Sequence, residues 1–174
     1  MRAALAAGAA IINDVSGLTG ERDSLAIAAA AGCPVVVMHM RGTPEMMQEC
    51  PVYRHAALDV FDWLEARVAA CRSAGIPLER IAVDPGIGFG KTLEHNIDIM
   101  RCAALYHGLG CAVLFGVSRK RYIAALSRNE PPLAREAGSL AAALELMNQG
   151  VQILRVHDVK AATQARAVWE ALHS

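Results

Sequence analysis

The sequence predicts an α/β protein built on a parallel sheet of about five strands. Short apolar runs alternate with helix-like segments along all 174 residues. No pair of these runs carries the turn signal of an antiparallel hairpin. Strands that alternate with helices form right-handed βαβ units, which join parallel neighbours. We therefore expect helices outside a parallel sheet, in a single domain covering residues 1–174.

Each strand is predicted from a short apolar run. Pro34–Met40 is a continuous β-branched run, typical of a strand buried on both faces. The five expected strands are Ala9–Asn13, Pro34–Met40, Arg80–Val83, Cys111–Val117 and Val151–His157.

The helices are predicted from amphipathic patterns and from the glycines that end them. Gly8 closes an alanine-rich N-terminal helix, and Gly32 and Gly75 end later ones. The loop Arg41–Tyr53 is polar and long enough to suggest a function. The other expected helices are Ser24–Ala31, Arg54–Ala74, Leu93–His107, Arg121–Ser127, Glu136–Asn148 and Ala161–His173.

Composition excludes several classes of partner. The formal net charge is zero and basic residues are spread along the chain, so we expect no nucleic-acid partner and no anionic membrane surface. No apolar stretch reaches the roughly 18–20 residues of a membrane span. The five cysteines lack a C-x-x-C spacing, which argues against zinc sites and disulfides and favours a cytoplasmic location. We interpret the N-terminus as structure rather than a targeting signal.

The segment Val83–Thr92 reads V-D-P-G-I-G-F-G-K-T and follows a predicted strand. A carboxylate at a strand tip, on a glycine-rich loop, is typical of ligand chemistry in α/β proteins. A Walker A loop would need glycine at Pro85, and a dinucleotide fingerprint would need glycine at Lys91. The remaining alternative is an ordinary strand-to-helix turn, because Asp-Pro-Gly is common turn chemistry.

Polar residues gather at the carboxyl ends of the predicted strands. In a parallel sheet these ends share one edge, so we expect their side chains to meet at one pocket. The residues are Asn13, His39, Asp84, Ser118, Arg119, Lys120, Arg155 and His157.

Three of these residues suit a flat heterocyclic ligand. The Asp84 carboxylate can accept two parallel hydrogen bonds from adjacent N–H groups of a ring. Lys120 and Asn13 could bind carbonyl oxygens or ring nitrogens of the same ligand. The alternatives are a solvated lysine at a helix start and an asparagine satisfied within its own turn.

Arg155 and His157 suit phosphate. Alternate residues of a strand project to the same side, so the two side chains could hold a phosphate or pyrophosphate together. A satisfied core histidine is the alternative for His157. The segment Ser118-Arg119-Lys120 opens a predicted helix, whose N-terminus favours an anion such as a carboxylate. Met38 and Met40 point away from His39, either into the core or along a ligand ring.

Five motifs occur together and in order: I-I-N-D-V-S-G at 11–17, V-M-H-M at 37–40, D-P-G-I-G-F-G-K at 84–91, G-V-S-R-K at 116–120 and R-V-H-D-V at 155–159. This set resembles the dihydropteroate synthase family over the whole chain. The resemblance implies a (β/α)8 TIM barrel. It also implies condensation of 6-hydroxymethyl-7,8-dihydropterin diphosphate with p-aminobenzoate, giving dihydropteroate and pyrophosphate through a delocalised pterin-methylene cation.

The resemblance also implies a role for each matching residue. Lys120, Arg155 and His157 would be catalytic, because they would stabilise the departing charge. Asn13, Asp84 and Lys120 would bind the pterin, Arg155 and His157 the diphosphate, Met38 and Gly116 would line the pterin slot, and Phe89, Ser118 and Arg119 would lie near p-aminobenzoate.

A complete barrel has eight strands in about 250 residues. The resemblance therefore implies a partial barrel that lacks the first three βα units, with unpaired sheet edges at Ala9–Asn13 and Val151–His157. The family's cofactor is Mg²⁺, but its asparagine ligand would lie in the first of those units, so we expect no metal ligand from this chain. A homodimer is a further family expectation. Two alternatives remain: a folate-binding methyltransferase barrel, against which the diphosphate pair argues, and an inactive or weakly pterin-binding fragment.

Overall fold

The structure, a computed structural model, describes residues 1–42 and 51–173. Its five strands form one sheet in the order β1-β2-β3-β4-β5, and every neighbouring pair is parallel. The prediction of about five parallel strands is therefore confirmed. The strands are β1 (Ile12–Asp14), β2 (Val35–Met38), β3 (Ile81–Asp84), β4 (Ala112–Phe115) and β5 (Ile153–Leu154).

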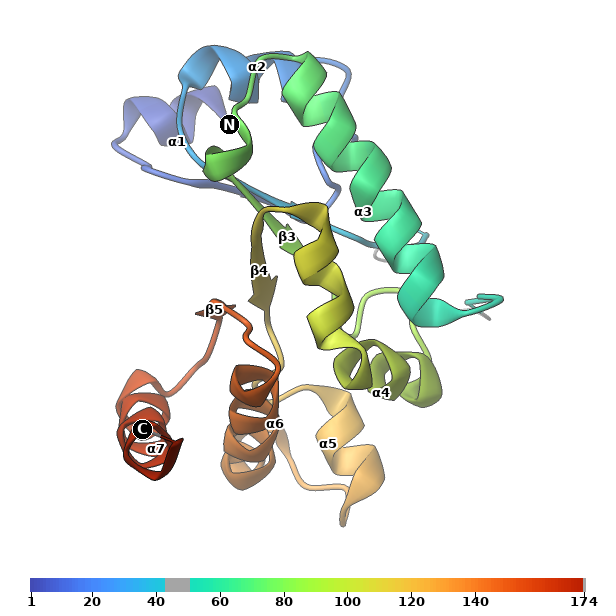
Figure 1. Cartoon of the computed structure of the whole chain (residues 1–174), viewed down its shortest axis with the longest axis vertical. Coiled ribbons are helices and arrows are strands. Elements are labelled where there is room, and N and C mark those ends of the chain that lie inside the picture. Colours follow the sequence, from blue (N-terminus) through green and yellow to red (C-terminus); the bar gives the residue numbers. More distant parts are fainter. Residues whose placement is uncertain (43–50, 174) are drawn as a thin grey trace.

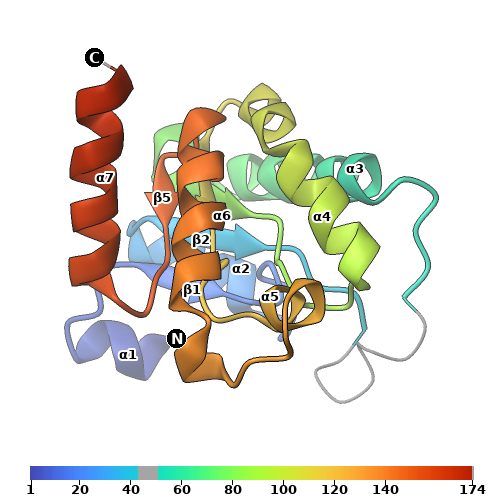
Figure 2. The same ribbon diagram turned by 90° about the horizontal axis from the view of Figure 1, so that it is seen from below.

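Helices follow the strands in sequence order, and the chain forms an arc from α1 to α7 (Figure 1). Helix α3 packs against α4, and α6 packs against α7, which lies beside β5 (Figure 2). The α-helices are α1 (Arg2–Ala6), α2 (Ser24–Ala31), α3 (Ala56–Ser73), α4 (Leu93–Arg101), α5 (Arg121–Leu126), α6 (Glu136–Asn148) and α7 (Val159–His173). The 3₁₀ helices are η1 (Leu78–Arg80), η2 (Ala103–Leu109) and η3 (Pro132–Ala134).

The main core lies between the helices and one face of the sheet. Val37 and Val83 are paired in the register and fully buried, and Leu64 of α3 belongs to the same cluster. The opposite face of the sheet, here called the inner face, carries a small separate cluster of Val36, Ala82 and Leu114. The two faces therefore separate packing from the polar groups described below.

Two predicted elements are shorter than expected, and each for a hydrogen-bonding reason. The predicted helix Leu93–His107 divides because the Gln149 side chain accepts the N–H of Ala104 and donates to the carbonyl of Met100. Strand β5 has only two residues, although the N–H of Arg155 still donates to a β4 carbonyl. Two residues further on, the N–H of His157 donates to the hydroxyl of Ser118 and not to a β4 carbonyl.

Other boundaries moved by a few residues. β1 begins at Ile12, whose N–H donates to the carbonyl of Pro34, and not at Ala9. The N-terminal helix before Gly8 is confirmed as α1. Most of the polar loop predicted at 41–53 lies outside the described residues. Among residues 1–42 and 51–173, no helix has both the length and the apolar character needed to cross a membrane.

Candidate functional site

The strand register places Asn13, Met38 and Asp84 on the inner face. Met38 is paired with Asp84 at the carboxyl ends of β2 and β3. Asn13 is paired with Val36, two residues before Met38, so it lies lower on the same face and is exposed on the edge strand. Because side chains alternate along strands, Asn13, Met38 and Asp84 lie on the same face, and Asn13 is further from the carboxyl ends of the strands than Met38 and Asp84.

A cavity of about 440 Å³ opens at the carboxyl ends of β4 and β5. Seven of the ten residues to which the family resemblance gives a role line it, together with two residues from η3. Asn13, Met38 and Asp84 do not line this cavity. The lining residues are Phe89, Gly116, Ser118, Arg119, Lys120, Pro132, Leu133, Arg155 and His157.

The Arg155 guanidinium lies directly over Gly116. A β-carbon added to Gly116 would be 2.8 Å from Nη2 of Arg155 and 3.3 Å from Cζ. Only the absence of a side chain at this position lets the guanidinium approach the β4 backbone so closely. The close approach presents an always-charged, planar donor group at the cavity wall.

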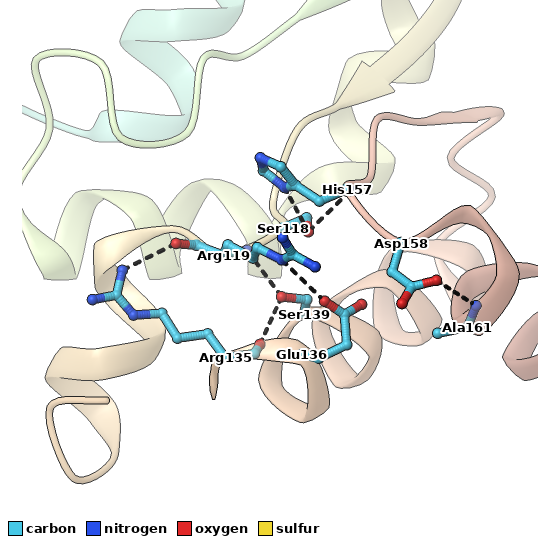
Figure 3. Close-up of polar contacts among 8 residues, drawn as sticks. All are labelled: Ser118, Arg119, Arg135, Glu136, Ser139, His157, Asp158 and Ala161. Carbon is cyan, nitrogen blue, oxygen red and sulfur yellow. Dashed lines mark hydrogen bonds and ion pairs between the residues drawn. The ribbon is translucent and has the colours of Figure 1, made fainter. Parts of the chain in front are cut away.

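Ser118 orients His157 (Figure 3). The backbone N–H of His157 donates to Oγ of Ser118 at 3.3 Å, and Nδ1 of His157 lies 3.0 Å from the same oxygen. Because the hydroxyl already accepts the backbone N–H, its own proton can be donated to Nδ1. In the tautomer in which Nδ1 accepts this proton, Nε2 of His157 carries the N–H and is a donor.

Helix α6 holds the segment Ser118–Lys120 in place (Figure 3). Arg119 has a φ of 58°, and its N–H donates to Oγ of Ser139 at 2.9 Å. Its carbonyl accepts a hydrogen bond from Arg135, and its Nε lies 3.3 Å from a carboxylate oxygen of Glu136. The N–H of Arg119 is therefore not free for a ligand anion, and helix α5 after it has only six residues.

Asp84 is a buried carboxylate with basic groups around it. Its side chain is 2% exposed, and Oδ1 accepts the N–H of Gly86 at 2.8 Å. Burial raises the pKa of Asp84, while the Gly86 hydrogen bond and the charges of Arg155, Lys120 and Lys91 oppose that rise. Asp84 is thus within electrostatic reach of the cavity without lining it.

Lys120 lines the cavity and interacts with both Phe89 and the buried Asp84. Its Nζ lies 4.5 Å from the centre of the Phe89 ring, at cation–π distance. Burial lowers the pKa of Lys120, the charge of Arg155 lowers it further, and Asp84 raises it. A ring placed between Asp84 and Phe89 would therefore meet a cation at one edge.

The prediction that His39 joins the common pocket is wrong. Its ring points to the helix side of the sheet and meets the Trp63 ring edge-on, with centroids 5.0 Å apart. Nδ1 of His39 lies 3.0 Å from Nζ of Lys91, a lysine that is only 3% exposed. Lys91 has no role among the sequence-based predictions, because no local sequence signal indicates that a lysine is buried.

The residues present do not fit a magnesium site. Across residues 1–42 and 51–173, no three His, Cys, Asp or Glu side chains are grouped so that they could hold a metal ion. The buried carboxylate of Asp84, near the cavity, is surrounded by cations instead.

A parallel sheet with its polar groups at the carboxyl ends of the strands defines the class of α/β barrel-type ligand-binding enzymes. The chain matches the family model "Pterin binding enzyme" over residues 1–157 and belongs to that family. It is 45% identical to the dihydropteroate synthase of Neisseria meningitidis serogroup C, covering 99% of this chain and 62% of that protein.

Solved structures agree. The chain superposes on dihydropteroate synthase from Stenotrophomonas maltophilia with a TM-score of 0.95 and 42% identity, covering 99% of this chain and 65% of that one. For dihydropteroate synthase from Thermus thermophilus in complex with 6HMPPP, the TM-score is 0.93 at 45% identity, covering 98% and 67%. The five strands thus correspond to part of the dihydropteroate synthase TIM barrel. The chain spans about three fifths of the length of its curated relatives.

Proposed function

We propose that this chain carries the pterin- and diphosphate-binding part of a dihydropteroate synthase site. The reaction would condense 6-hydroxymethyl-7,8-dihydropterin diphosphate with p-aminobenzoate, giving 7,8-dihydropteroate and pyrophosphate. The observation that carries the proposal is the meeting of Lys120, Arg155 and His157 in one cavity beside the buried Asp84. Two cations and a histidine N–H suit a diphosphate, and a carboxylate suits a pterin edge.

The pterin would lie against the inner face between β3 and β4. Asp84 would accept hydrogen bonds from two adjacent N–H groups of the ring, and Lys120 would donate to its oxygen or nitrogen atoms. Met38 is 2% exposed and paired with Asp84, so it would form part of the floor beneath the ring. Asn13 would contribute from the edge strand.

The diphosphate would lie between Arg155 and His157. When the bond between the pterin methylene carbon and the diphosphate oxygen breaks, the bonding electron pair leaves with pyrophosphate. Arg155, Lys120 and the Nε2–H of His157 would stabilise that charge, because they face the cavity before the bond breaks. The pterin-methylene cation left behind then forms a carbon–nitrogen bond with the amine of p-aminobenzoate, which releases a proton to solvent.

The second substrate would enter on the side of Phe89, Ser118 and Arg119. These residues line the cavity, and Phe89 offers a ring on which an aromatic amine can stack. The family's Mg²⁺ is given no step here, because the described residues supply no ligand set for it. The reaction would take place in the cytoplasm, where thiols such as Cys71 stay reduced.

The comparisons support this reading. A Xanthomonas albilineans dihydropteroate synthase 40% identical to this chain was solved in complex with 7,8-dihydropteroate. A product assay with p-aminobenzoate would distinguish the alternative of an inactive or weakly binding fragment. A methyltransferase barrel is less well supported, because methyl transfer from a folate leaves Arg155 and His157 without a diphosphate to bind.

Calorimetric titration of the chain with 6-hydroxymethyl-7,8-dihydropterin diphosphate, with and without Mg²⁺, tests the proposal. Asp84→Asn keeps the shape of the side chain and removes its charge. Asp98→Asn makes the same change at an exposed position of α4 and serves as the matched control.

Saturable binding that Asp84→Asn weakens at least tenfold, and Asp98→Asn leaves unchanged, would support the pterin site; losing one charged hydrogen-bonding pair costs about 1.5–3 kcal/mol. A product assay with p-aminobenzoate then separates an active chain from a fragment that only binds. A folded chain that binds no pterin diphosphate would refute the proposed function.

A further inference from the structure

Lys91 has an unusual environment for a lysine. It is 3% exposed, and its Nζ lies 2.9 Å from the carbonyl oxygen of Gly86, 3.0 Å from that of Phe89 and 3.0 Å from Nδ1 of His39. These three acceptors match the three donors of an ammonium group. The carbonyl oxygen of His39 lies further away, at 3.5 Å.

The acceptors belong to two loops that are far apart in the sequence. His39 follows β2, whereas Gly86 and Phe89 follow β3. The two loops also touch backbone to backbone: a β-carbon at Gly86 would lie 3.1 Å from the carbonyl carbon of His39, and one at Gly90 would lie 3.0 Å from that of Arg41. The Lys91 ammonium adds side-chain hydrogen bonds between these segments to the backbone hydrogen bond in which the N–H of His39 donates to the carbonyl of Asp84 at 2.9 Å.

The β3 loop carries two of the groups assigned to the pterin. Gly86 donates its N–H to Asp84, and Phe89 presents its ring to Lys120. Lys91 binds the carbonyls of both Gly86 and Phe89. The position of the ammonium thus sets the loop that fixes the Asp84 carboxylate and the Phe89 ring.

We propose that Lys91 is a positioning residue that fastens the β2 loop to the β3 loop and thereby shapes the pterin-binding wall. It touches no substrate in this arrangement and acts through Asp84 and Phe89. The inference rests on the proposed function for its ligand. Its structural part, the fastening of two loops, stands on the geometry alone.

The hydrogen bonds require a protonated Lys91 and a neutral His39. Burial lowers the pKa of His39 to about 3, and the charges of Lys91 and Arg41 lower it as well. Burial also lowers the pKa of Lys91 to about 7, Asp84 raises it and Lys120 lowers it. The hydrogen bonds from Lys91 to His39, Gly86 and Phe89 should therefore be complete near pH 6 and weaken as the pH rises above 7.

The wild-type chain offers a direct test. It contains three lysines, Lys91, Lys120 and Lys160. With ¹⁵N-labelled lysine and histidine at pH 6, NMR should show a slowly exchanging Lys91 ammonium and an unprotonated Nδ1 on His39. A neutral Lys91 amine, or a proton on Nδ1, would overturn the proposal without any variant.

A variant tests the consequence for the loops. In Lys91→Met, amide hydrogen exchange at Gly86 and Phe89 should accelerate at least about tenfold, because their segment loses its anchor. The amide of Arg155, bonded between β4 and β5, should keep its rate. Lys160→Met, at an exposed position of α7, is the matched control and should change none of these rates.

Two ligands separate positioning from general destabilisation. Lys91→Met should weaken binding of 6-hydroxymethylpterin about tenfold or more, since small misplacements of binding groups have effects of that size. Binding of inorganic pyrophosphate, which depends mainly on Arg155 and His157 after β5, should change less than about twofold. Equal losses for both ligands, or unchanged loop exchange, would overturn the proposal. If the wild-type chain binds neither ligand, the proposed function fails. The exchange and NMR results alone then decide whether Lys91 fastens the β2 loop to the β3 loop.

Discussion

Replacing Gly116 with alanine should weaken pyrophosphate binding while leaving the fold intact. The new β-carbon would lie 2.8 Å from Nη2 of Arg155, about 0.6 Å inside the 3.4 Å at which ordinary contact begins. Gly116 does not have a positive φ, so its backbone accepts alanine without strain. The guanidinium is the end of a flexible side chain and should move instead of the strand.

The size of the effect follows from what Arg155 would lose. Its two parallel hydrogen bonds to a phosphate would be misaligned, at a cost of about 2 kcal/mol, which corresponds to roughly 30-fold weaker binding. The thermal midpoint should shift by less than about 3 °C, because only the guanidinium is displaced and alanine restricts the unfolded chain slightly.

Calorimetry with pyrophosphate measures the first quantity, and circular dichroism melting measures the second. Gly108→Ala is the matched control, since its β-carbon would lie 3.5 Å from the Phe61 ring at ordinary contact distance. The double variant with Arg155→Ala gives a further check. If the alanine acts only by displacing the guanidinium, Gly116→Ala should have no additional effect once Arg155 is removed.

The reasoning would be refuted by unchanged pyrophosphate binding in Gly116→Ala. It would also be refuted by additive effects in the double variant, because the alanine would then act on something other than Arg155. A fall in thermal midpoint well beyond 3 °C would show that the strand moved rather than the side chain.

Three further changes have expected outcomes. Ser118→Ala should weaken pyrophosphate binding about fivefold, because His157 loses the hydroxyl that orients its ring; calorimetry measures this, and unchanged affinity would contradict it. His39→Asn should make stability less sensitive to acid. The folded state binds fewer protons than the unfolded state between about pH 6.5 and 3. The wild-type unfolding free energy therefore decreases as the pH is lowered, by up to about 1.4 kcal/mol per pH unit. Melting from pH 7 to 4 should give a shallower slope in the variant, and equal slopes would exclude this role. Ser139→Ala should lower the unfolding free energy by about 1–3 kcal/mol in urea titrations, because the N–H of Arg119 loses its acceptor; a loss below about 0.5 kcal/mol would speak against it.

The fold could be predicted because each strand is a local signal. Val35–Met38 is buried at all four positions, as its continuous β-branched run indicates, and the glycine after helix α2 has the expected left-handed conformation. The ends of elements were harder to predict. The division of the helix after Leu93 and the shortness of β5 depend on hydrogen bonds that Gln149 and Ser118 accept from residues distant in sequence. That residues 1–174 form one domain stays a prediction.

The candidate site could be predicted in part for the same reason. Lys120, Arg155 and His157 follow strands, so a parallel sheet alone brings them to one edge, and the cavity contains all three. Contacts across the register could not be foreseen: nothing local indicates that Gly116 lies under Arg155. The hydrogen bonds of Lys91 could not be predicted, because two loops that are far apart in the sequence must converge before the buried ammonium has three acceptors.

The order of the strands divides the residues of the proposed pterin site into two groups that should contribute differently to ligand binding. Asp84, Lys120 and Arg155 come from β3, β4 and β5 or the loops that follow them, and these strands are neighbours. Their mutual positions therefore depend only on pairings within this chain. Asn13 lies on β1, two strands away from Asp84, and it is exposed, whereas Asp84 is buried. We therefore expect the cations and Asp84 to be preorganised and Asn13 to add least, a ranking that Asn13→Ala and Asp84→Asn titrations would reverse if β1 were instead the rigid part.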